Sequence, residues 1–318
     1  MSVFNGAEYV GQAVESILNQ TFHDFEFIIV DDGSTDKTPA IIGSFTDSRI
    51  RIIRNESNLG LPRSLNKGIK EANGMYLARQ DADDISDKLR LEKQLKKAEV
   101  CKSDLLGCAL LNIDISGNLL SISSIDDFDK LDKKKLLSER RMLFAHGSAF
   151  IRKNSLEEVG FYNEGLFYAQ DAELWMRFID RGMKISYLSE PRYCLRRMPI
   201  KNDKKVVGQK AYMECLRGYY ILNNGHRDGT SLDMEIQKIN DFLDSREPVQ
   251  YENYLSDYWH YCSTTCLIES RNKRQAFKYI IKAIKEKKSF VQFVSHLIVL
   301  SSMILPFSLL CFLGKRKQ

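Results

Sequence analysis

The stretch that decides the fold is Phe25-Glu-Phe-Ile-Ile-Val-Asp-Asp-Gly-Ser-Thr-Asp36. Its first half, as far as Val30, is too continuously apolar for a strand with one face in water. Such a strand lies in the middle of a sheet that helices cover on both faces. The second half, from Asp31, has the acidic and small residues of a turn. The stretch therefore predicts a central strand that ends in an acidic loop.

The sequence on either side alternates strand and helix patterns. Ile50 to Ile53 and Met75 to Ala78 are short apolar runs that we expect to be strands. Between the runs, apolar residues recur with helical spacing. Three alternations predict an α/β fold with a doubly wound, mostly parallel, Rossmann-like sheet. The helical positions are Val10, Val14, Ile17 and Leu18, with Asn5 able to cap their helix, then Ile41, Ile42 and Phe45, then Leu61, Leu65 and Ile69.

The first apolar run, Met1 to Phe4, is short. A sheet of this kind usually begins with a strand of about five or six residues. Either the natural start lies upstream or the chain has been truncated, and the sequence does not decide between the two.

The middle of the chain has a different pattern of apolar residues. Gly117-Asn118 separates two apolar runs and predicts a hairpin in the type II′ style. His146 to Ile151 is expected to form another short strand. Asp171 to Arg181 has helical spacing and is followed by Gly182, the residue type expected just after a helix. Residues 202 to 288 are mostly helical in pattern.

Carboxylates follow two of the predicted strands directly. Asp31 and Asp32 come after one strand, and Asp81, Asp83 and Asp84 follow the other. In an open parallel sheet, ligands bind outside the carboxyl ends of the strands, so both clusters line one crevice. Gathered carboxylates repel each other unless a cation is present, and Mg²⁺ or Mn²⁺ with a nucleotide satisfies them. Taken singly, each cluster could also be ordinary turn chemistry or an acidic helix start.

Four motifs in order give the chain a family resemblance. They are Ile28-Ile-Val-Asp-Asp-Gly-Ser-Thr-Asp36, then Asn58-Leu-Gly60 with Asn66-Lys-Gly68, then Gln80-Asp-Ala-Asp-Asp84, then Ala169-Gln-Asp-Ala-Glu-Leu-Trp175. Over roughly residues 1 to 198 the chain resembles the family 2 inverting glycosyltransferases of the GT-A fold. Val3-Phe-Asn-Gly6 is similar to the end of that family's first strand, where Pro-x-Tyr-Asn is usual.

The resemblance implies a reaction and a set of donor-binding residues. The reaction is transfer of a sugar from a nucleotide diphosphate to an acceptor hydroxyl, with inversion at the anomeric carbon. Asp32 is implied to accept a hydrogen bond from the base, which is expected to be uracil, with Asp31 and Asn5 shaping the nucleotide pocket. Asp81 faces the ribose or the metal, and Asp83 ligates the Mg²⁺ or Mn²⁺ that bridges the diphosphate, where it stabilises the leaving group's charge.

The resemblance makes Asp171 the catalytic base. An acceptor hydroxyl is a poor nucleophile near neutral pH, so a carboxylate must take its proton during attack. The alternative for Asp171 is a helix N-cap. Glu173 is the reserve candidate for the base, although two positions along a helix turn it away from Asp171. Gln170 stands where the family often has Glu, which removes one negative charge.

Basic residues near the donor phosphates are the other candidates. Arg63 replaces a small residue of the family pattern and could place a cation near the phosphates. Arg197, or its neighbour Arg196, could clamp the diphosphate or be part of a surface pair. His146 lies where the family forms its acceptor side, and a buried structural histidine is the alternative.

The C-terminal segment indicates membrane contact. Phe290 to Leu313 is 24 residues without a formal charge, which as a helix would span about 36 Å against roughly 30 Å of bilayer hydrocarbon. Basic residues on both sides favour a helix in the interface over a true span, and a buried helix is the remaining alternative. We expect three parts: a glycosyltransferase domain at 1–200, a helical extension at 201–288 and a membrane-associated segment at 289–318. The location implied is the cytoplasmic face of the cell membrane.

Composition and charge limit the other function classes. The 318 residues carry 47 Lys and Arg against 42 Asp and Glu, 43% are apolar, and the net charge is +5. A disordered or fibrous protein is excluded. Residues 271–318 hold eleven basic residues and one acidic residue, so the anionic partner expected is a membrane surface and not nucleic acid. The acceptor expected is a lipid-linked saccharide or a polysaccharide.

Two alternatives to a glycosyltransferase can be weighed from the residues. A sugar-phosphate nucleotidylyltransferase needs a glycine-rich phosphate loop after the first strand, which Asn5-Gly6-Ala7-Glu8 does not supply. A non-catalytic nucleotide-sugar binder would tolerate loss of Asp83 and Asp171, and both are present. Cys262, Cys266 and His260 do not fit a common zinc spacing and are read as ordinary helix residues.

Overall fold

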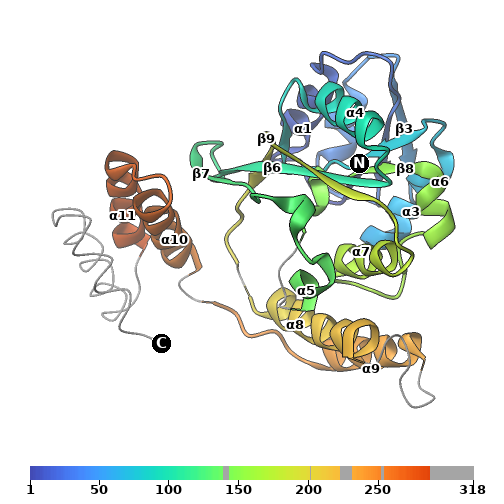
Figure 1. Ribbon diagram of the computed structural model, residues 1–318. Coiled ribbons are helices and arrows are strands. Elements are labelled where there is room, and N and C mark those ends of the chain that lie inside the picture. The colour runs from blue at the N-terminus through green and yellow to red at the C-terminus, as the bar shows by residue number, and fades with distance from the viewer. Residues whose placement is uncertain (139–142, 201, 223–230, 252–253, 287–318) are drawn as a thin grey trace. The chain divides into compact units, whose positions relative to one another are not determined.

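The computed structural model describes residues 1–138, 143–200, 202–222, 231–251 and 254–286. The chain divides into two compact units. The first contains residues 1–111, 123–195 and 205–247, and the second contains residues 112–122, 196–204 and those from 248 onward. Residues 205–247 thus belong to the same compact unit as most of residues 1–195, whereas the sequence predicts a boundary near residue 200. The ribbon of the described residues is shown in Figure 1.

A small parallel sheet opens the first unit. Its strand order is β1 (Ser2–Val3), β2 (Phe27–Asp31) and β3 (Ile50–Arg54). All five residues of β2 are buried, as the apolar stretch predicts. One face of β2 packs against Val10, Val14 and Ile17 of α1, and the helices that connect the strands are α1 (Val10–Leu18), α2 (Thr38–Gly43) and α3 (Leu61–Glu71).

A second, mixed sheet corrects the expectation of one doubly wound, mostly parallel sheet. Its order is β4-β8-β6-β9-β5, with β7 paired to β6. Strand β8 runs antiparallel to both β4 and β6, and β5 runs antiparallel to β9. The sheets are split because β1 has only two paired residues and meets the chain after β4 in the single bridge Ser2 to Asp81. The strands are β4 (Tyr76–Ala78), β5 (Ile85–Ser86), β6 (Leu105–Ile113), β7 (Leu119–Ser123), β8 (Phe150–Arg152) and β9 (Ile185–Arg196).

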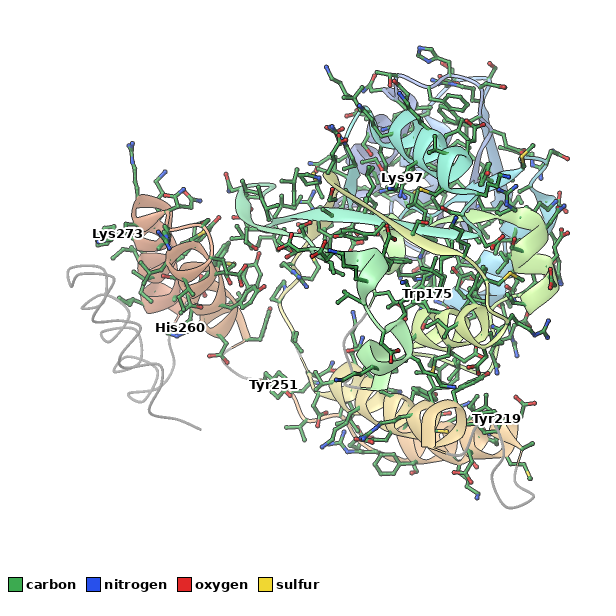
Figure 2. The ribbon with its side chains drawn as sticks, in the orientation of Figure 1. Lys97, Trp175, Tyr219, Tyr251, His260 and Lys273 are labelled. Atoms are coloured by element: carbon green, nitrogen blue, oxygen red, sulfur yellow. The ribbon has the colours of Figure 1, made fainter. Side chains whose placement is uncertain are left out.

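Helices cover both faces of the mixed sheet. Helix α4 (Arg90–Cys101) lies on one face and α7 (Gln170–Asp180) on the other (Figure 1). Neighbouring residues of β6 pack on opposite faces of the sheet: Leu105 packs with the α7 core, and Leu106 packs with Ala98 of α4. Trp175 is fully buried in the α7 core (Figure 2). This layering is what the strand and helix alternation predicts.

The connection into β8 differs from the sequence prediction. His146–Ser148 is a short 3-10 turn, and the strand is Phe150–Arg152. A second short 3-10 turn covers Phe128–Lys130, α5 covers Lys133–Ser138, and α6 covers Lys153–Val159.

The first unit is completed by helices that follow β9 in the chain. Helix α8 (Lys204–Leu216) continues into a π-helical turn at Arg217–Leu222, and α9 covers Leu232–Ser245. Tyr212 of α8 and Leu243 of α9 form one apolar cluster with Leu166. The expectation of helices here is confirmed.

The second unit is a helix pair on a hairpin tip. Helices α10 (Tyr254–Ile268) and α11 (Lys273–Glu286) share an apolar cluster with Leu120. The hairpin is present, but its turn is not the two-residue type expected. The Gly117 N–H donates to the Asp114 carbonyl, and the Asp114 carboxylate accepts N–H groups of Ser116 and Asn118. The Asp114 carboxylate therefore sets the turn.

The cysteines of α10 are ordinary core residues. Cys262 and Cys266 are fully buried among apolar side chains. Burial raises their pKa, to about 12 and about 11, and so favours the thiol over the thiolate that binds zinc. In the described part of the chain no helix is both long and apolar enough to cross a membrane. The predicted membrane segment at 289–318 lies outside the described residues.

Candidate functional site

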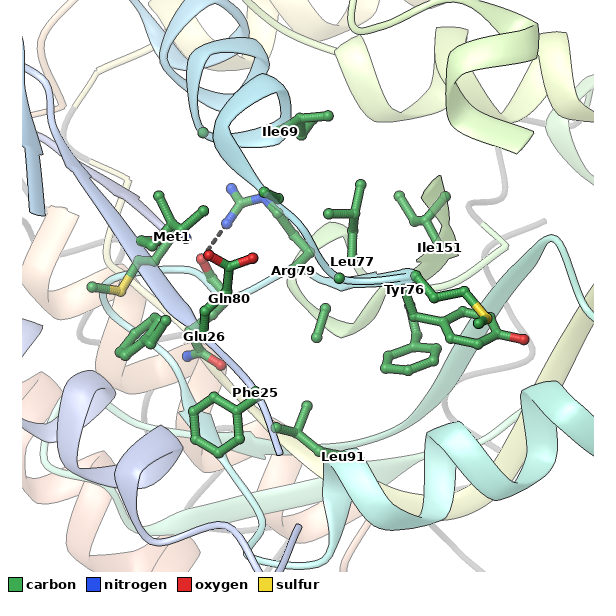
Figure 3. Close-up of a pocket in the computed structure, with 18 of the residues that line it drawn as sticks. Met1, Phe25, Glu26, Ile69, Tyr76, Leu77, Arg79, Gln80, Leu91 and Ile151 are labelled. Carbon is green, nitrogen blue, oxygen red and sulfur yellow. Dashed lines mark hydrogen bonds between the residues drawn. The ribbon is translucent and has the colours of Figure 1, made fainter. Parts of the chain in front are cut away.

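The loop after β4 carries an ion pair between a buried arginine and a partly exposed aspartate. Arg79 is 7% exposed, and its Nη2 donates to Asp81 Oδ1 at 2.6 Å. Its Nη1 donates to the Gln80 carbonyl (Figure 3). The Asp81 N–H donates to the Tyr193 hydroxyl at 3.1 Å, and Ser2 of β1 bridges to Asp81 in parallel. Burial opposes the charge of Asp81, but the Arg79 guanidinium outweighs it and lowers the pKa of Asp81. Asp81 is therefore a fixed, charged carboxylate.

A second arginine holds the backbone of this loop in place. Arg90 is fully buried, and its guanidinium donates to the carbonyls of Arg79 at 2.7 Å and Gly147 at 2.9 Å. Gly147 has no room for a side chain, because a Cβ there would lie 1.9 Å from the Tyr193 hydroxyl and 2.6 Å from Asp81 Oδ2. Arg90 thus joins the acidic loop to the turn before β8.

The carboxylates of this loop have the donor chemistry of a divalent cation site. Asp83 is half-buried two residues beyond Asp81, and Asp84 is buried. Within the described ranges, no three His, Cys, Asp or Glu residues are grouped as a metal site. Mg²⁺ is commonly held by one or two carboxylates and completed by phosphates and water, so Asp83 and Asp81 fit such an ion in kind and number. One carboxylate oxygen of Asp81 already accepts a hydrogen bond from Arg79.

Asp171 lies in the first turn of α7, close to the acidic loop. Burial raises the pKa of Asp171, and the Asp81 charge raises it further while Arg79 opposes. The helix N-cap is Ala169, in the left-handed region at φ 58°, so the N-cap alternative for Asp171 is wrong. One carboxylate oxygen accepts the N–H of Ala172 at 3.0 Å. Asp171 therefore combines a raised pKa with a place near the charges of Asp81 and Arg79.

The reserve base Glu173 is already engaged. It is 2% exposed, and Arg177 donates to its two oxygens at 2.8 and 2.7 Å. The Tyr220 hydroxyl donates to the same carboxylate at 2.9 Å. Arg177 also donates to the backbone carbonyls of residues 159, 160 and 161. Glu173 fixes α7 to the preceding loop and is not a base in this geometry.

A histidine and a tyrosine lie beside Asp171 and Asp81. His146 Nε2 and the Tyr162 hydroxyl are hydrogen-bonded at 2.8 Å. Burial, reinforced by Arg79, lowers the pKa of His146 to about 3, so the ring is neutral at physiological pH. Burial raises the pKa of Tyr162, and the Asp171 and Asp81 charges add to this. The pair can offer hydrogen bonds but no charge.

The other acidic cluster is organised around Asp32. Asp32 is 2% exposed and accepts hydrogen bonds from the Asn55 amide and from the N–H groups of Leu59 and Gly60. Asp31 accepts the Ser34 N–H at 3.0 Å, and its other oxygen lies 3.5 Å from Arg54. The residues predicted to contact the nucleotide thus hold the 55–60 segment and the 31–36 loop.

Asn5 anchors the same loop and does not cap α1. Its Oδ1 accepts the Thr35 N–H at 2.9 Å, and its own N–H donates to Ser34 at 3.0 Å. The cap residue of α1 is Tyr9, without a side-chain hydrogen bond. The capping prediction is therefore wrong, because Asn5 takes a left-handed conformation at φ 49° and turns toward the loop.

The arginines predicted to bind the donor phosphates have protein partners in the structure. Arg63 is exposed on α3 and lies 3.6 Å from Glu164. Arg197 belongs to the second unit, where its Nε donates to Asn112 at 3.0 Å. Arg196 is buried in that unit and donates to the Asp114 and Ile115 carbonyls.

Two cations of the site escaped prediction. Arg79 and Arg90 flank the acidic motif, and each looks in the sequence like an ordinary surface arginine. The available signal was position, because Arg79 directly follows an apolar strand and precedes Gln80-Asp81. Tyr162 and Tyr193 had no signal, since their partners are distant in sequence.

Comparisons with known proteins identify the family. A family model described as Glycosyl transferase family 2 matches residues 1–160. An uncharacterized glycosyltransferase of Methanocaldococcus jannaschii, MJ1057, is 35% identical over 230 residues, which is 70% of this chain and 76% of the relative. The O-antigen biosynthesis glycosyltransferase WbnJ of Escherichia coli is 29% identical over 68% of this chain and 84% of its own.

A solved structure supports the fold. The structure of S. aureus TarS residues 1–349 in complex with UDP covers 90% of this chain and 87% of its own, with a TM-score of 0.56 and 19% identity. A second TarS structure, in complex with UDP-GlcNAc, has a TM-score of 0.53, 16% identity, and covers 95% of this chain and 79% of its own. The likeness agrees with a GT-A type α/β fold followed by C-terminal helices. The chain belongs to glycosyl transferase family 2, whose members transfer sugars from nucleotide sugars.

Proposed function

We propose that this protein transfers a sugar from a UDP-sugar to a hydroxyl of a saccharide acceptor, in a single displacement with inversion at the anomeric carbon. The observation that carries the proposal is Asp171, a carboxylate of raised pKa in the first turn of α7 that feels the charges of Asp81 and Arg79. A base whose pKa is moved toward neutral is better matched to removing the proton of an attacking hydroxyl. The base would act on the acceptor, and the Asp81 loop would hold the donor.

The donor end of the proposal rests on the two acidic clusters. TarS has been solved with UDP and with UDP-GlcNAc, which supports a uridine donor here. Asn5 and Asp31 hold the 31–36 loop for the nucleotide. Asp32 accepts three hydrogen bonds that fix the Leu59–Gly60 backbone, and a carboxylate can accept about four, so we keep it as the acceptor for the base.

A divalent cation is part of the proposal. The carboxylates of Asp83 and Asp81 would hold Mg²⁺ or Mn²⁺. When bound, the ion supplies positive charge that stabilises the leaving nucleotide diphosphate. In this chain Arg79 keeps Asp81 ionised, and Arg90 fixes the backbone from which both carboxylates project.

We propose a class of acceptor and a cellular location for the enzyme. WbnJ is named for O-antigen biosynthesis, which supports a lipid-linked saccharide or polysaccharide acceptor here. We place the enzyme at the cytoplasmic face of the membrane, on the strength of the basic and apolar residues 271–318.

The test is sugar transfer by the full chain with Mn²⁺ and a panel of UDP-sugars. The wild type is compared with Asp171→Asn, and Asp180→Asn at the other end of α7 is the matched control. We expect Asp171→Asn to lose about 10²- to 10⁴-fold in kcat and to keep UDP binding, with the control near wild type. Product anomeric configuration, read by NMR, reports inversion. Full activity in Asp171→Asn, or retained configuration, would overturn the assignment.

A further inference from the structure

Helix α11 of the second unit carries two apolar stripes. The first consists of buried residues at i, i+3, i+4 and i+7, which are Ala276, Tyr279, Ile280 and Ala283. The second consists of residues at i, i+4 and i+7, which are Phe277, Ile281 and Ile284. Both spacings keep their members on one face of a helix, so the two stripes are separate faces. Only the first faces α10.

The packing of the first stripe fixes the rotation of α11 about its own axis. Helices α10 and α11 lie side by side (Figure 1) and share one apolar cluster. The Ser263 hydroxyl of α10 donates to the Ala276 carbonyl at 2.9 Å, and the Ser256 hydroxyl donates to the Ala283 carbonyl at 3.0 Å. Because these two carbonyls lie two turns apart on α11, the helix cannot rotate without breaking both hydrogen bonds. The second stripe is therefore held in a fixed direction, away from the first.

The second stripe is open. Phe277 is 52% exposed, and Ile281 and Ile284 are half-buried. At about 100° per residue, this stripe is centred roughly 120° around the helix from the buried one. Neighbouring exposed apolar side chains with polar residues beside them are typical of a binding surface.

Cations border the open stripe. Three exposed basic residues lie roughly 70° further round the helix, namely Arg274, Lys278 and Lys285. Lys273 lies at the beginning of the stripe. The remaining cation of α11, Lys282, lies over the Trp259 ring at 4.1 Å from its centroid and so belongs to the packed side. In all, α11 contains five basic residues and one acidic residue.

The two properties of this face together indicate its partner. A bilayer with anionic headgroups matches both, because apolar side chains enter the acyl boundary while Lys and Arg remain among the lipid phosphates. The apolar residues 290–313 of the same chain carry no formal charge. Packed on α11, they could cover the stripe but would leave its cations without a partner.

We propose that α11 lies in the plane of an anionic membrane surface, with Phe277, Ile281 and Ile284 in the acyl boundary and the cations beside them on the lipid phosphates. This contact rests on the proposed membrane location of the enzyme and adds the protein face and the lipid class that make it. The folded helix pair thereby becomes a membrane-binding element in its own right, in addition to residues 289–318.

The first test measures binding of the full chain to vesicles of phosphatidylcholine, with and without phosphatidylglycerol. Phe277→Gln removes the most exposed side chain of the stripe. Phe242→Gln on α9 is the matched control, since Phe242 is 49% exposed. We expect Phe277→Gln to weaken binding to the anionic vesicles by about tenfold, because one aromatic side chain no longer enters the acyl boundary. The control should bind as the wild type does, and both variants should keep the wild-type Tm.

The second test separates the lipid phosphates from general apolar adhesion. The double variant Lys278→Gln with Lys285→Gln should weaken binding to the anionic vesicles by at least about tenfold. It should leave binding to phosphatidylcholine alone unchanged. Lys96→Gln with Lys97→Gln on α4 makes the same change of net charge and is the control.

Three outcomes would overturn the proposal. The first is equal binding by the wild type and both α11 variants, because residues 289–318 would then account for the attachment. The second is no binding of the wild type to anionic vesicles. The third is a lower Tm for Phe277→Gln with unchanged binding, which would assign the stripe to packing within the chain. Sugar transfer to a water-soluble acceptor is measured in parallel: its absence in the wild type would count against the proposed reaction and leave the vesicle result standing.

Discussion

The Arg79 guanidinium lies 2.6 Å from Asp81 Oδ1 while being only 7% exposed. The buried Arg79 is thereby paired with a carboxylate that we propose as a metal ligand. The pair also fixes the position of the acidic loop.

Replacing Arg79 by Met should destabilise the protein by about 2–3 kcal/mol, because the buried guanidinium and its hydrogen bonds are lost and the partly exposed Asp81 carboxylate loses its charged partner. Arg51→Met is the control, since Arg51 and Glu71 form an exposed pair at 2.9 Å, worth about 1 kcal/mol or less. Urea unfolding measures both. The Asp81 pKa is lowered, so the contribution of the pair is present above the ordinary carboxyl pKa of about 4 and disappears as the pH falls below it. Equal losses in the two variants would contradict the buried pair.

The raised pKa of Asp171 predicts opposite effects on activity and stability. Since the folded state disfavours the ionised form, the penalty is absent below the ordinary pKa of about 4 and complete above the raised one. Asp171→Asn should therefore raise Tm at pH 7 and converge with the wild type toward pH 4. In the wild type, kcat/KM should fall as the pH drops through the raised pKa. A lower Tm for the variant at pH 7 would refute this account.

His146 should not shape that pH profile. Its pKa is lowered to about 3, so the ring stays neutral between pH 5 and 9. We expect His146→Gln to keep the same acidic midpoint of kcat/KM even if the absolute rate falls. Tyr162→Phe, which removes the hydroxyl on the other side of the hydrogen bond, is the paired variant. A shift of the midpoint by one pH unit in His146→Gln would show that the ring titrates.

Glu173→Gln should cost stability and leave catalysis mostly intact. The change removes a charge from a buried pair whose Arg177 partner is fixed by three carbonyls, so we expect a loss of about 3 kcal/mol. Glu157→Gln, at a partly exposed 3.8 Å pair with Lys153, is the control. Chemical unfolding and kcat are measured together. A kcat loss as large as that of Asp171→Asn, with unchanged stability, would return Glu173 to the role of base.

Metal removal should abolish transfer and Mn²⁺ should restore it. Asp83→Asn is expected to weaken Mn²⁺ binding in the presence of UDP by at least about tenfold, because one ionised ligand is lost. Glu56→Gln, an exposed carboxylate of the first unit, is the control. Calorimetry follows the metal and does not depend on turnover. Unchanged Mn²⁺ affinity in Asp83→Asn would remove the metal assignment.

The sequence was most informative where burial alone dictates the pattern. The apolar run ending at Val30 forms β2 as expected, and α7 begins and ends within one residue of its predicted limits. The mixed sheet was not predictable, because β4 pairs with β8 more than seventy residues later and short apolar runs do not encode the direction of pairing. Helical spacing, which is local, therefore proved the safer guide.

The site was predictable as chemistry but not as contacts. Carboxylates at strand ends pointed to a cation and a nucleotide, and those roles remain predictions. The contacts of Asp32 could not be foreseen, because its partners in the 55–60 segment lie more than twenty residues away and are brought together by tertiary packing. The other two pairs are local: Glu173 and Arg177 are four residues apart on α7, and Arg79 and Asp81 are two residues apart. Helical spacing could have predicted the Glu173 pair.

The absence of room at Gly147 has an evolutionary consequence. Even a methyl group there would collide with Tyr193 and Asp81 together. Moving Tyr193 alone would not make room for a side chain, because the Tyr193 hydroxyl accepts the Asp81 N–H and the two residues would have to move together. Drift at residue 147 is thus coupled to drift in the acidic motif, and a library that diversifies the turn before β8 should leave this glycine fixed.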